Sequence, residues 1–294
     1  MYYYSWMTKI NTKVLMSGAE FFDDAQAINS YMDDHVPVDV AKAVAEHNEI
    51  MRCFAEAGIE VVKVDPPKAC QDGVYTANWA LVIGGKAVLS NLPNARKAEE
   101  PYAHAELHKL SLNTVKLPPE LRFSGQGDAL PCGDYVFVGS HYRTSPEVHP
   151  ILEKEFGKKV IGVQAIPQLD QAGQPVVNSF SGWPDSYFYD LDLAIAVIRP
   201  NLIAWCPEAL VSESQAAIRA IEGIDKIEVS LEEALGASAC NLVSTGETVI
   251  MGSRAPKLKA ELESRGLKVL APDISELMKG GGFIRCTSLT LDNL

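Results

Sequence analysis

The chain has 294 residues, of which 47% are apolar and 22% are charged, the composition of an ordinary globular protein. Its net charge of −12 argues against a nucleic-acid partner, because affinity for phosphate comes from clustered Lys and Arg. No apolar run approaches the roughly 18 residues that would span a membrane, so the sequence predicts no membrane-spanning helix.

The cysteines are spread widely and form no CxxC pair, so the sequence indicates neither a zinc site nor another metal site. The first residues lack the basic-then-apolar order of a signal peptide. We therefore expect a cytoplasmic protein with reduced thiols and no cofactor. A small molecule is the expected partner, and self-association stays open.

Five β-rich runs follow amphipathic stretches along the chain. The clearest helix candidates are 39–58, 212–223 and 255–266, which carry the cap residues Gly58, Ser212 and Gly266. The runs that follow the amphipathic stretches are 58–67, 111–119, 157–166, 223–230 and 266–274.

Paired apolar runs precede four of the helices, each pair interrupted by a turn. They occupy 74–91, 127–140, 190–206 and 240–253, and the stretch 14–22 could open the first unit. A strand–turn–strand–helix–strand unit repeated five times predicts one domain over 1–294, closed radially around a central pocket. The stretch 167–187 is expected to be a long loop over one face.

Polar residues stand where the first strand of several units begins. The same place in several units would bring them together on the axis, as a pocket with a few oriented polar groups requires. Each also has a structural interpretation: Cys286 as a packed core thiol, Asp128 as a turn residue, Asn78 as the end of a strand. The residues are Asn78, Ser124, Asp128, Asp190, Asp192, Asn241, Arg285 and Cys286.

Several of these stretches resemble the guanidine-modifying pentein superfamily, above all its arginine dihydrolase and dimethylargininase-like branch. "VYTANWALVIGGKAVLSN" is similar to "VFTANAGLVxGxKxxLSNF", and "KGGGFIRCTSLTL" is similar to "KSGGGxxCLTLEL". "GDAL", "GSHYRTSPEVHPIL", "FFDDAQAINSYM" and "ACNLV" also have counterparts. The resemblance covers the chain from about Val14 to its end. It implies a five-bladed α/β propeller and covalent catalysis by a thiolate on a guanidinium carbon.

The resemblance also implies roles for single residues. Cys286 matches the nucleophile and Asp192 the acid that grips the guanidinium, while Arg143 matches the arginine that holds the substrate carboxylate. The same resemblance suggests further substrate-binding residues: Asn29, Asn78 and a basic residue that is Arg96 or Lys97. Asp128 of "GDAL" also belongs to the expected pocket.

Two positions depart from the family pattern. The family histidine of "HLD" is Asp190 here, and the family glutamate falls at Ser124. A carboxylate cannot lower the pKa of a thiol as a cation does, and it lacks the near-neutral pKa of a proton shuttle. His141, two residues before Arg143, could enter the pocket and replace the missing imidazole, or it could be a half-buried loop residue.

Three functions stay open at this point. The first is a cysteine hydrolase of a guanidine, amidine or ureido group in an arginine-like molecule, with an altered proton relay through Asp190 or His141. The second is a pseudoenzyme that binds an arginine-like amino acid without turnover. The third, a purely structural protein, is disfavoured because Cys286, Asp192, Asn78 and Arg143 are all retained.

Overall fold

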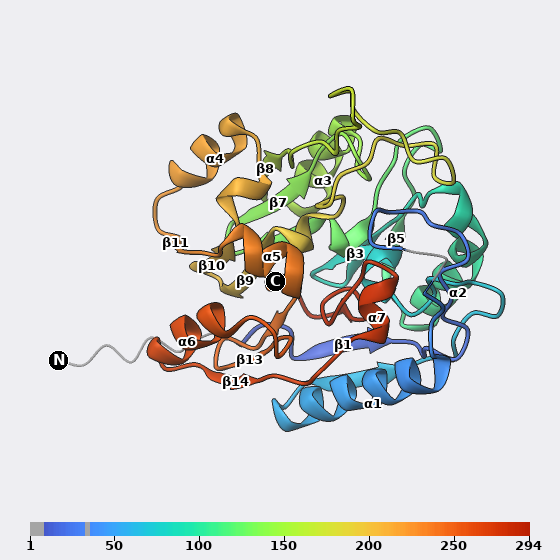
Figure 1. The fold of residues 1–294 in the computed structure, drawn as a ribbon, viewed down its shortest axis with the longest axis horizontal. Helices are drawn as coiled ribbons and strands as arrows, with labels where there is room; N and C mark the ends of the chain where they lie inside the picture. Colours follow the sequence, from blue (N-terminus) through green and yellow to red (C-terminus); the bar gives the residue numbers. More distant parts are fainter. Residues whose placement is uncertain (1–8, 33–35) are drawn as a thin grey trace.

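A computed structural model describes residues 9–32 and 36–294. Five three-stranded sheets are arranged around a common axis, with the helices outside them (Figure 1). In every sheet the middle strand pairs antiparallel with one neighbour and parallel with the other. The expected five-bladed α/β propeller is confirmed.

The five blades have the strand orders β15–β1–β2, β3–β4–β5, β6–β7–β8, β9–β10–β11 and β12–β13–β14. The strands are β1 (Lys13–Met16), β2 (Glu60–Lys63), β3 (Ala80–Ile83), β4 (Lys86–Leu89), β5 (Asn113–Val115), β6 (Ala129–Cys132), β7 (Tyr135–Gly139), β8 (Lys159–Val163), β9 (Ile195–Arg199), β10 (Leu202–Trp205), β11 (Asp225–Glu228), β12 (Val243–Ser244), β13 (Thr248–Ile250), β14 (Lys268–Leu270) and β15 (Leu289–Thr290). The α-helices are α1 (Val40–Glu56), α2 (Glu100–Lys109), α3 (His149–Phe156), α4 (Ser212–Arg219), α5 (Leu231–Ala237), α6 (Pro256–Ser264) and α7 (Glu276–Lys279).

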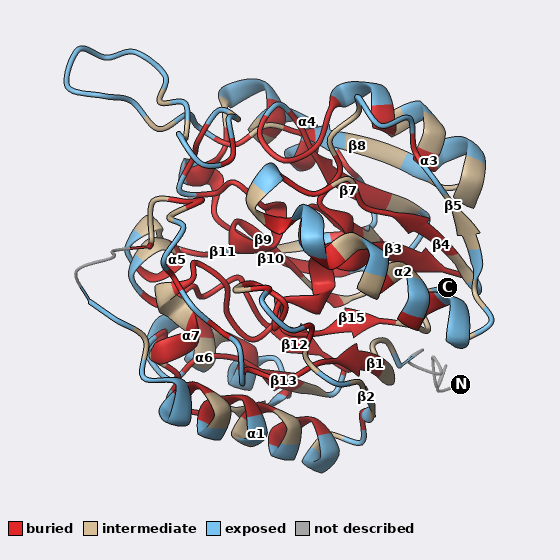
Figure 2. Ribbon diagram, turned by 90° about the vertical axis from the view of Figure 1, so that its right-hand side faces the viewer, coloured by how far each residue is buried: buried red, intermediate tan, exposed pale blue. Residues whose placement is uncertain are grey.

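Local sequence explains why the blades form where they do. Gly84 and Gly85, both at positive φ, close the β3–β4 hairpin, and the apolar residues on either side of it are buried. Asp39 caps α1 by accepting a hydrogen bond from the Lys42 amide, and the helix buries one side against the core. Figure 2 shows the result: buried inner strands and helices exposed on their outer sides.

The first blade is closed by the end of the chain. β15 pairs with β1 through Val14 opposite Thr290 and Leu15 opposite Leu289. This pairing joins segments about 275 residues apart in sequence, so the propeller ring is closed by main-chain hydrogen bonds between the two ends of the fold.

The site residues lie just before the inner strands, not on them. Three short 3₁₀ turns, Thr76–Trp79, Gly125–Gly127 and Leu191–Leu193, precede β3, β6 and β9. Cys286 likewise lies in a turn before β15. These turns stand where the sequence places the start of each first strand.

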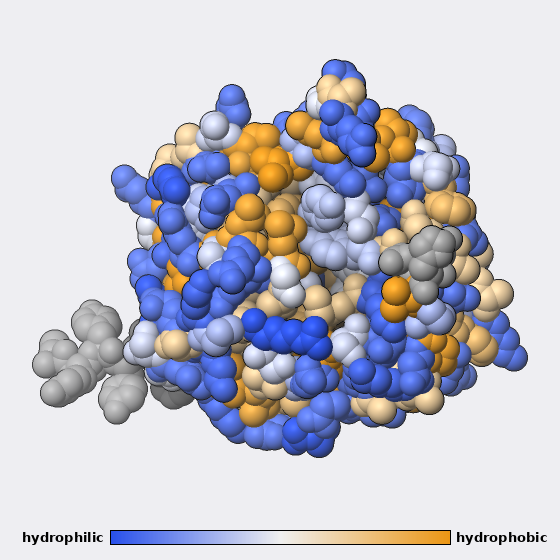
Figure 3. Space-filling view, viewed as in Figure 1, coloured by the Kyte–Doolittle hydropathy of each residue, from blue (hydrophilic) through white to orange (hydrophobic). Residues whose placement is uncertain are grey.

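The stretch 167–187 is the loop that the sequence predicts. Two isolated bridges, Leu169 with Pro175 and Val177 with Pro184, give it an extended, hairpin-like course. It exposes several apolar side chains, among them Phe180, and apolar groups show at the upper edge of the face in Figure 3. Among the residues described, no helix is both long and apolar enough to cross a membrane.

Candidate active site

The turns before the inner strands meet at a small buried cavity. It contains about 230 Å³ of empty space, of which only about 10 Å³ admits the centre of a water molecule. The cavity therefore has room for about one water molecule. Its walls are Ile28, Asn29, Asp72, Tyr75, Asn78, Arg96, Arg143, Tyr189, Asp190, Gly280, Gly282 and Cys286.

Cys286 is 2% exposed and its thiol has two polar neighbours. The sulfur donates to Asp192 Oδ2 at 3.3 Å and accepts from Asn241 Nδ2 at 3.1 Å. The other side of the Asn241 amide accepts from the main-chain N–H groups of Arg285 and Cys286, at 2.8 and 3.2 Å. Asn241 therefore fixes both the sulfur and the backbone that carries it.

Burial raises the pKa of the Cys286 thiol well above its ordinary value, and the carboxylates of Asp192 and Asp190 raise it further. Burial and the Asp190 carboxylate also raise the pKa of Asp192. The pKa of Asp128 rises for the same two reasons. Cys286, Asp192 and Asp128 thus favour their neutral forms.

Asp190 occupies the place that the family gives to histidine, and it is tied to Asn78. Asn78 Nδ2 donates to Asp190 Oδ2 at 2.7 Å and to Ser124 Oγ at 2.9 Å. A Cβ at Gly127 would lie 2.4 Å from Asn78 Nδ2 and 2.9 Å from Asp190 Oδ2. Glycine at 127 is therefore what allows the two turns to approach so closely. Asp190 Oδ1 is buried without a hydrogen bond among the described residues.

Asp128 and Asp192 stand behind the cavity wall. Asp128 Oδ1 accepts from the Leu191 main-chain N–H at 2.9 Å, which links the Gly125–Gly127 turn to the Leu191–Leu193 turn. Asp192 reaches the cavity through its contact with Cys286. Asp128 therefore holds the two turns together, and Asp192 lies beside the thiol.

Two arginines line the cavity, and their surroundings differ. Arg96, not Lys97, is the buried basic residue: it pairs with Glu99 at 2.8 Å and donates to Asn78 Oδ1 at 2.8 Å. Arg143 stacks 4.3 Å over the Tyr189 ring and donates to the Ile28 carbonyl at 2.8 Å. Within the described part of the chain Arg143 forms no ion pair, so its charge is the one available to an incoming anion.

Asn29 lines the cavity at its other end. Its Nδ2 donates to the Gly280 carbonyl at 3.0 Å, and its Oδ1 accepts from the Tyr31 amide. These bonds fasten the 28–32 stretch to the glycine run before Cys286. Asn29 is thus placed with the cavity residues, where the sequence predicted it.

His141 does not lie in this site. Its side chain is exposed, its backbone has a φ of 79°, and it is absent from the cavity wall. The main-chain N–H of His141 bonds to the Thr144 carbonyl in a tight turn, and this turn directs His141 outward while Arg143 points inward. The expectation of a replacement imidazole is therefore corrected. Within the described residues, no histidine lines the cavity.

Four contributors to the site have no role that could be assigned from the sequence. Asn241 was visible as a polar residue before an inner strand, but nothing local showed that it would contact the thiol. Tyr189 stands next to Asp190 and stacks on Arg143. Asp72 and Tyr75 come from the loop before the "TAN" turn, where no motif singled them out, and the structure places both in the wall.

Comparison with known proteins agrees with this geometry. The family described as "N,N dimethylarginine dimethylhydrolase, eukaryotic" matches residues 19–291. The N(G),N(G)-dimethylarginine dimethylaminohydrolase of Mycobacterium tuberculosis is 29% identical over 94% of this chain and 84% of that protein. The bifunctional arginine dihydrolase/ornithine cyclodeaminase ArgZ of Synechocystis is 28% identical over 94% of this chain, which spans 37% of that longer protein.

Solved structures show the same fold. The N-terminal domain of ArgZ, an arginine dihydrolase from cyanobacteria bound to its product, superposes with a TM-score of 0.85 at 27% identity, over 96% of this chain and 97% of that one. A dimethylarginine dimethylaminohydrolase from Pseudomonas aeruginosa complexed with citrulline has a TM-score of 0.74 at 19% identity, over 95% of this chain and 99% of that one. This chain therefore belongs to the dimethylarginine dimethylaminohydrolase family of the pentein fold.

Proposed function

We propose that this protein is a cysteine-dependent hydrolase that cleaves a C–N bond in the guanidino group of an arginine-like amino acid. The observation that carries the proposal is the position of the Cys286 sulfur. It lies in the wall of a cavity that also presents the Asp190 carboxylate and the Arg143 guanidinium, which forms no ion pair with any described residue, and it is 3.3 Å from Asp192.

The charges of the cavity suit a zwitterion with a second cationic end. Arg143 can bind the α-carboxylate, because planar guanidinium–carboxylate pairs are strong and directional. Asp190 and Asp192 can accept N–H groups of a guanidinium close to the sulfur. The cavity as it stands is too small for such a ligand, so its walls have to move outward on binding.

A bound guanidinium also supplies the positive charge that the thiol lacks. Its arrival beside Cys286 favours the thiolate, as cationic neighbours do. The thiolate then adds to the guanidinium carbon. The thiol proton passes to the Asp192 carboxylate, 3.3 Å from the sulfur, and Asp192 gives it to the leaving amine, a role that its raised pKa suits. Water next gives one proton to the Asp192 carboxylate as it attacks the thiouronium carbon. The C–S bond then breaks, the second water proton goes to the sulfur, and the ureido product and the thiol are released.

A binding protein without turnover is the second candidate. No imidazole of the described residues lines the cavity, which favours it, because losing a general acid–base typically costs a hundredfold to ten-thousandfold in rate. The serine at 124, whose hydroxyl accepts from Asn78, points the same way. Both candidates share the ligand class and differ in whether the guanidino carbon changes its bonds.

Incubation with guanidino-¹³C-labelled arginine and dimethylarginine, followed by carbon NMR, tests turnover. We expect a slow rise of a ureido signal with the wild type and none with Cys286→Ser. Calorimetry with Cys286→Ser measures binding separately. Millimolar or tighter binding without any ureido signal would establish the binding protein, and no binding of either compound would overturn both candidates.

A further inference from the structure

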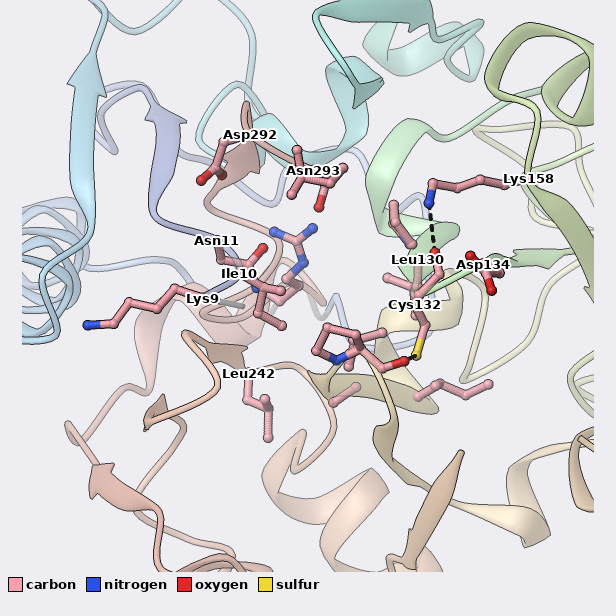
Figure 4. Close-up of a pocket in the computed structure, with 18 of the residues that line it drawn as sticks. Lys9, Ile10, Asn11, Leu130, Cys132, Asp134, Lys158, Leu242, Asp292 and Asn293 are labelled. Carbon is pink, nitrogen blue, oxygen red and sulfur yellow. Dashed lines mark hydrogen bonds between the residues drawn. The ribbon is translucent and has the colours of Figure 1, made fainter. Parts of the chain in front are cut away.

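A second cavity lies next to the catalytic turn but shares no wall residue with the first. It measures about 310 Å³, at the lower end of the range for small-molecule sites. The inner strands β6 and β9 form one side of it, and the segments 9–11 and 292–294 form another (Figure 4). Cys286 lines the first cavity, whereas Arg285, its neighbour in the chain, lines the second.

Arg285 is 7% exposed and keeps an unused charge. Its Nη1 donates to the Ser288 carbonyl at 2.9 Å and to Thr290 Oγ1 at 3.3 Å. Within the described part of the chain, Nε and Nη2 make no hydrogen bond and the guanidinium forms no ion pair. A buried charge is costly unless it is paired, so this guanidinium needs an anion.

The rest of the wall limits what that anion can be. Leu130, Ile195, Val197 and Leu242 provide apolar surface. Lys9 already pairs with Glu247, Lys158 donates to the Gly133 carbonyl, and the carboxylates of Asp134 and Asp292 stand at the same cavity (Figure 4). These acids disfavour a ligand with several negative charges. The wall therefore fits one carboxylate on a small apolar body.

Arg285 is also connected to the catalytic thiol. Its main-chain N–H donates to Asn241 Oδ1, and the same Asn241 side chain donates to the Cys286 sulfur. The positive charge of the guanidinium also attracts the negative charge of the Cys286 thiolate through space. An anion on Arg285 would cancel that influence and act on the residue that holds the thiol in place.

We propose that the second cavity is a regulatory site for a small apolar monocarboxylate, which binds Arg285 and makes Cys286 less reactive. Binding at this site would change the reactivity of the thiol whether or not the protein hydrolyses a guanidine. That this change regulates hydrolysis rests on the proposed function.

The test uses phenylacetate and its neutral counterpart phenylacetamide on the full chain. Calorimetry should give a saturable isotherm for phenylacetate and none for phenylacetamide. At saturation, iodoacetamide should alkylate Cys286 at least about threefold more slowly, as measured by mass spectrometry of the peptide that contains it. Because alkylation needs no turnover, this result is independent of whether the hydrolase proposal holds.

Two variants locate the binding. Val197→Trp fills the cavity and leaves Arg285 intact, and Arg285→Gln removes the charge; both should abolish the isotherm. Val177→Trp, in the exposed 167–187 loop, is the matched control and should bind as the wild type does. Arg143→Gln should also bind normally. Equal binding of the amide, binding that survives Val197→Trp, or loss of binding only in Arg143→Gln would overturn the proposal.

Discussion

Replacing Asp192 by Asn should make Cys286 markedly more reactive. The sulfur and Asp192 Oδ2 are 3.3 Å apart. At that distance two full charges repel by about 5 kcal/mol with an effective dielectric constant near 20. Burial and Asp190 raise the pKa of Asp192, which favours its neutral form, so only part of this repulsion acts on the thiolate. A quarter of it, about 1.3 kcal/mol, still corresponds to roughly tenfold in thiolate population.

The assay is the rate of iodoacetamide alkylation of Cys286 between pH 6 and 10. The wild type should react only toward alkaline pH, because burial and two carboxylates raise the pKa of its thiol. Asp192→Asn should shift the curve to lower pH and react about tenfold faster at pH 7.5. Asp273→Asn, an exposed acid that does not line the cavity, is the control. A rate for Asp192→Asn equal to or below that of the wild type would refute the electrostatic account.

Four further outcomes are expected. His141→Ala should leave the alkylation curve of Cys286 unchanged, since that side chain is exposed; a shift of the curve would put its imidazole back near the thiol. In a Cys286→Ser background, Arg143→Gln should weaken arginine binding in calorimetry by roughly tenfold or more, as for a lost hydrogen-bonded charge pair; unchanged affinity would mean that another group holds the carboxylate. Gly281→Ala should lower the free energy of unfolding by about 1–3 kcal/mol in urea titrations, because φ is +78° and the new Cβ would lie 2.5 Å from Asn29; a smaller loss would show that the loop adapts. Burial raises the pKa of Asp72 to about 6, so Asp72 binds its proton more tightly in the folded than in the unfolded state and its contribution to stability falls as the pH rises from 4 to 6. The free energy of unfolding of Asp72→Asn should therefore exceed that of the wild type by about 2–3 kcal/mol at pH 7.5 and by little at pH 3.5. A difference independent of pH would contradict this.

The sequence predicts the blades well because each carries its own signal. A glycine or polar turn between two apolar runs marks each inner pair of strands, as at Gly84 and Gly85, and the outer strand follows a capped helix. The closing pair is different. β15 consists of Leu289 and Thr290 alone, and its partner β1 lies at the other end of the chain, so no local pattern could show that they meet.

The sequence predicts which residues form the site better than it predicts what each of them contacts. Asn78, Asp190 and Cys286 share one cavity because equivalent turns of a radial array point toward one axis. Arg285 shows the limit of that reasoning. It adjoins Cys286 in sequence and seemed part of the same convergence, yet consecutive residues in a turn can face opposite ways, and its side chain enters the other cavity.

The substitution of Asp for the family histidine changes the charge that acts on Cys286 before a ligand binds. An imidazolium would keep the thiol ionised before any ligand arrives, whereas here burial and like charges favour neutral Cys286 and Asp192. A guanidinium entering between Asp190 and the sulfur reverses both influences at once, because its charge favours the thiolate and the carboxylate together. Reactivity in this cavity is therefore tied to occupancy by a cation. In the proposed reaction a neutral ureido product would lose that stabilisation as soon as it forms, and this argues for release of product once the C–S bond has broken.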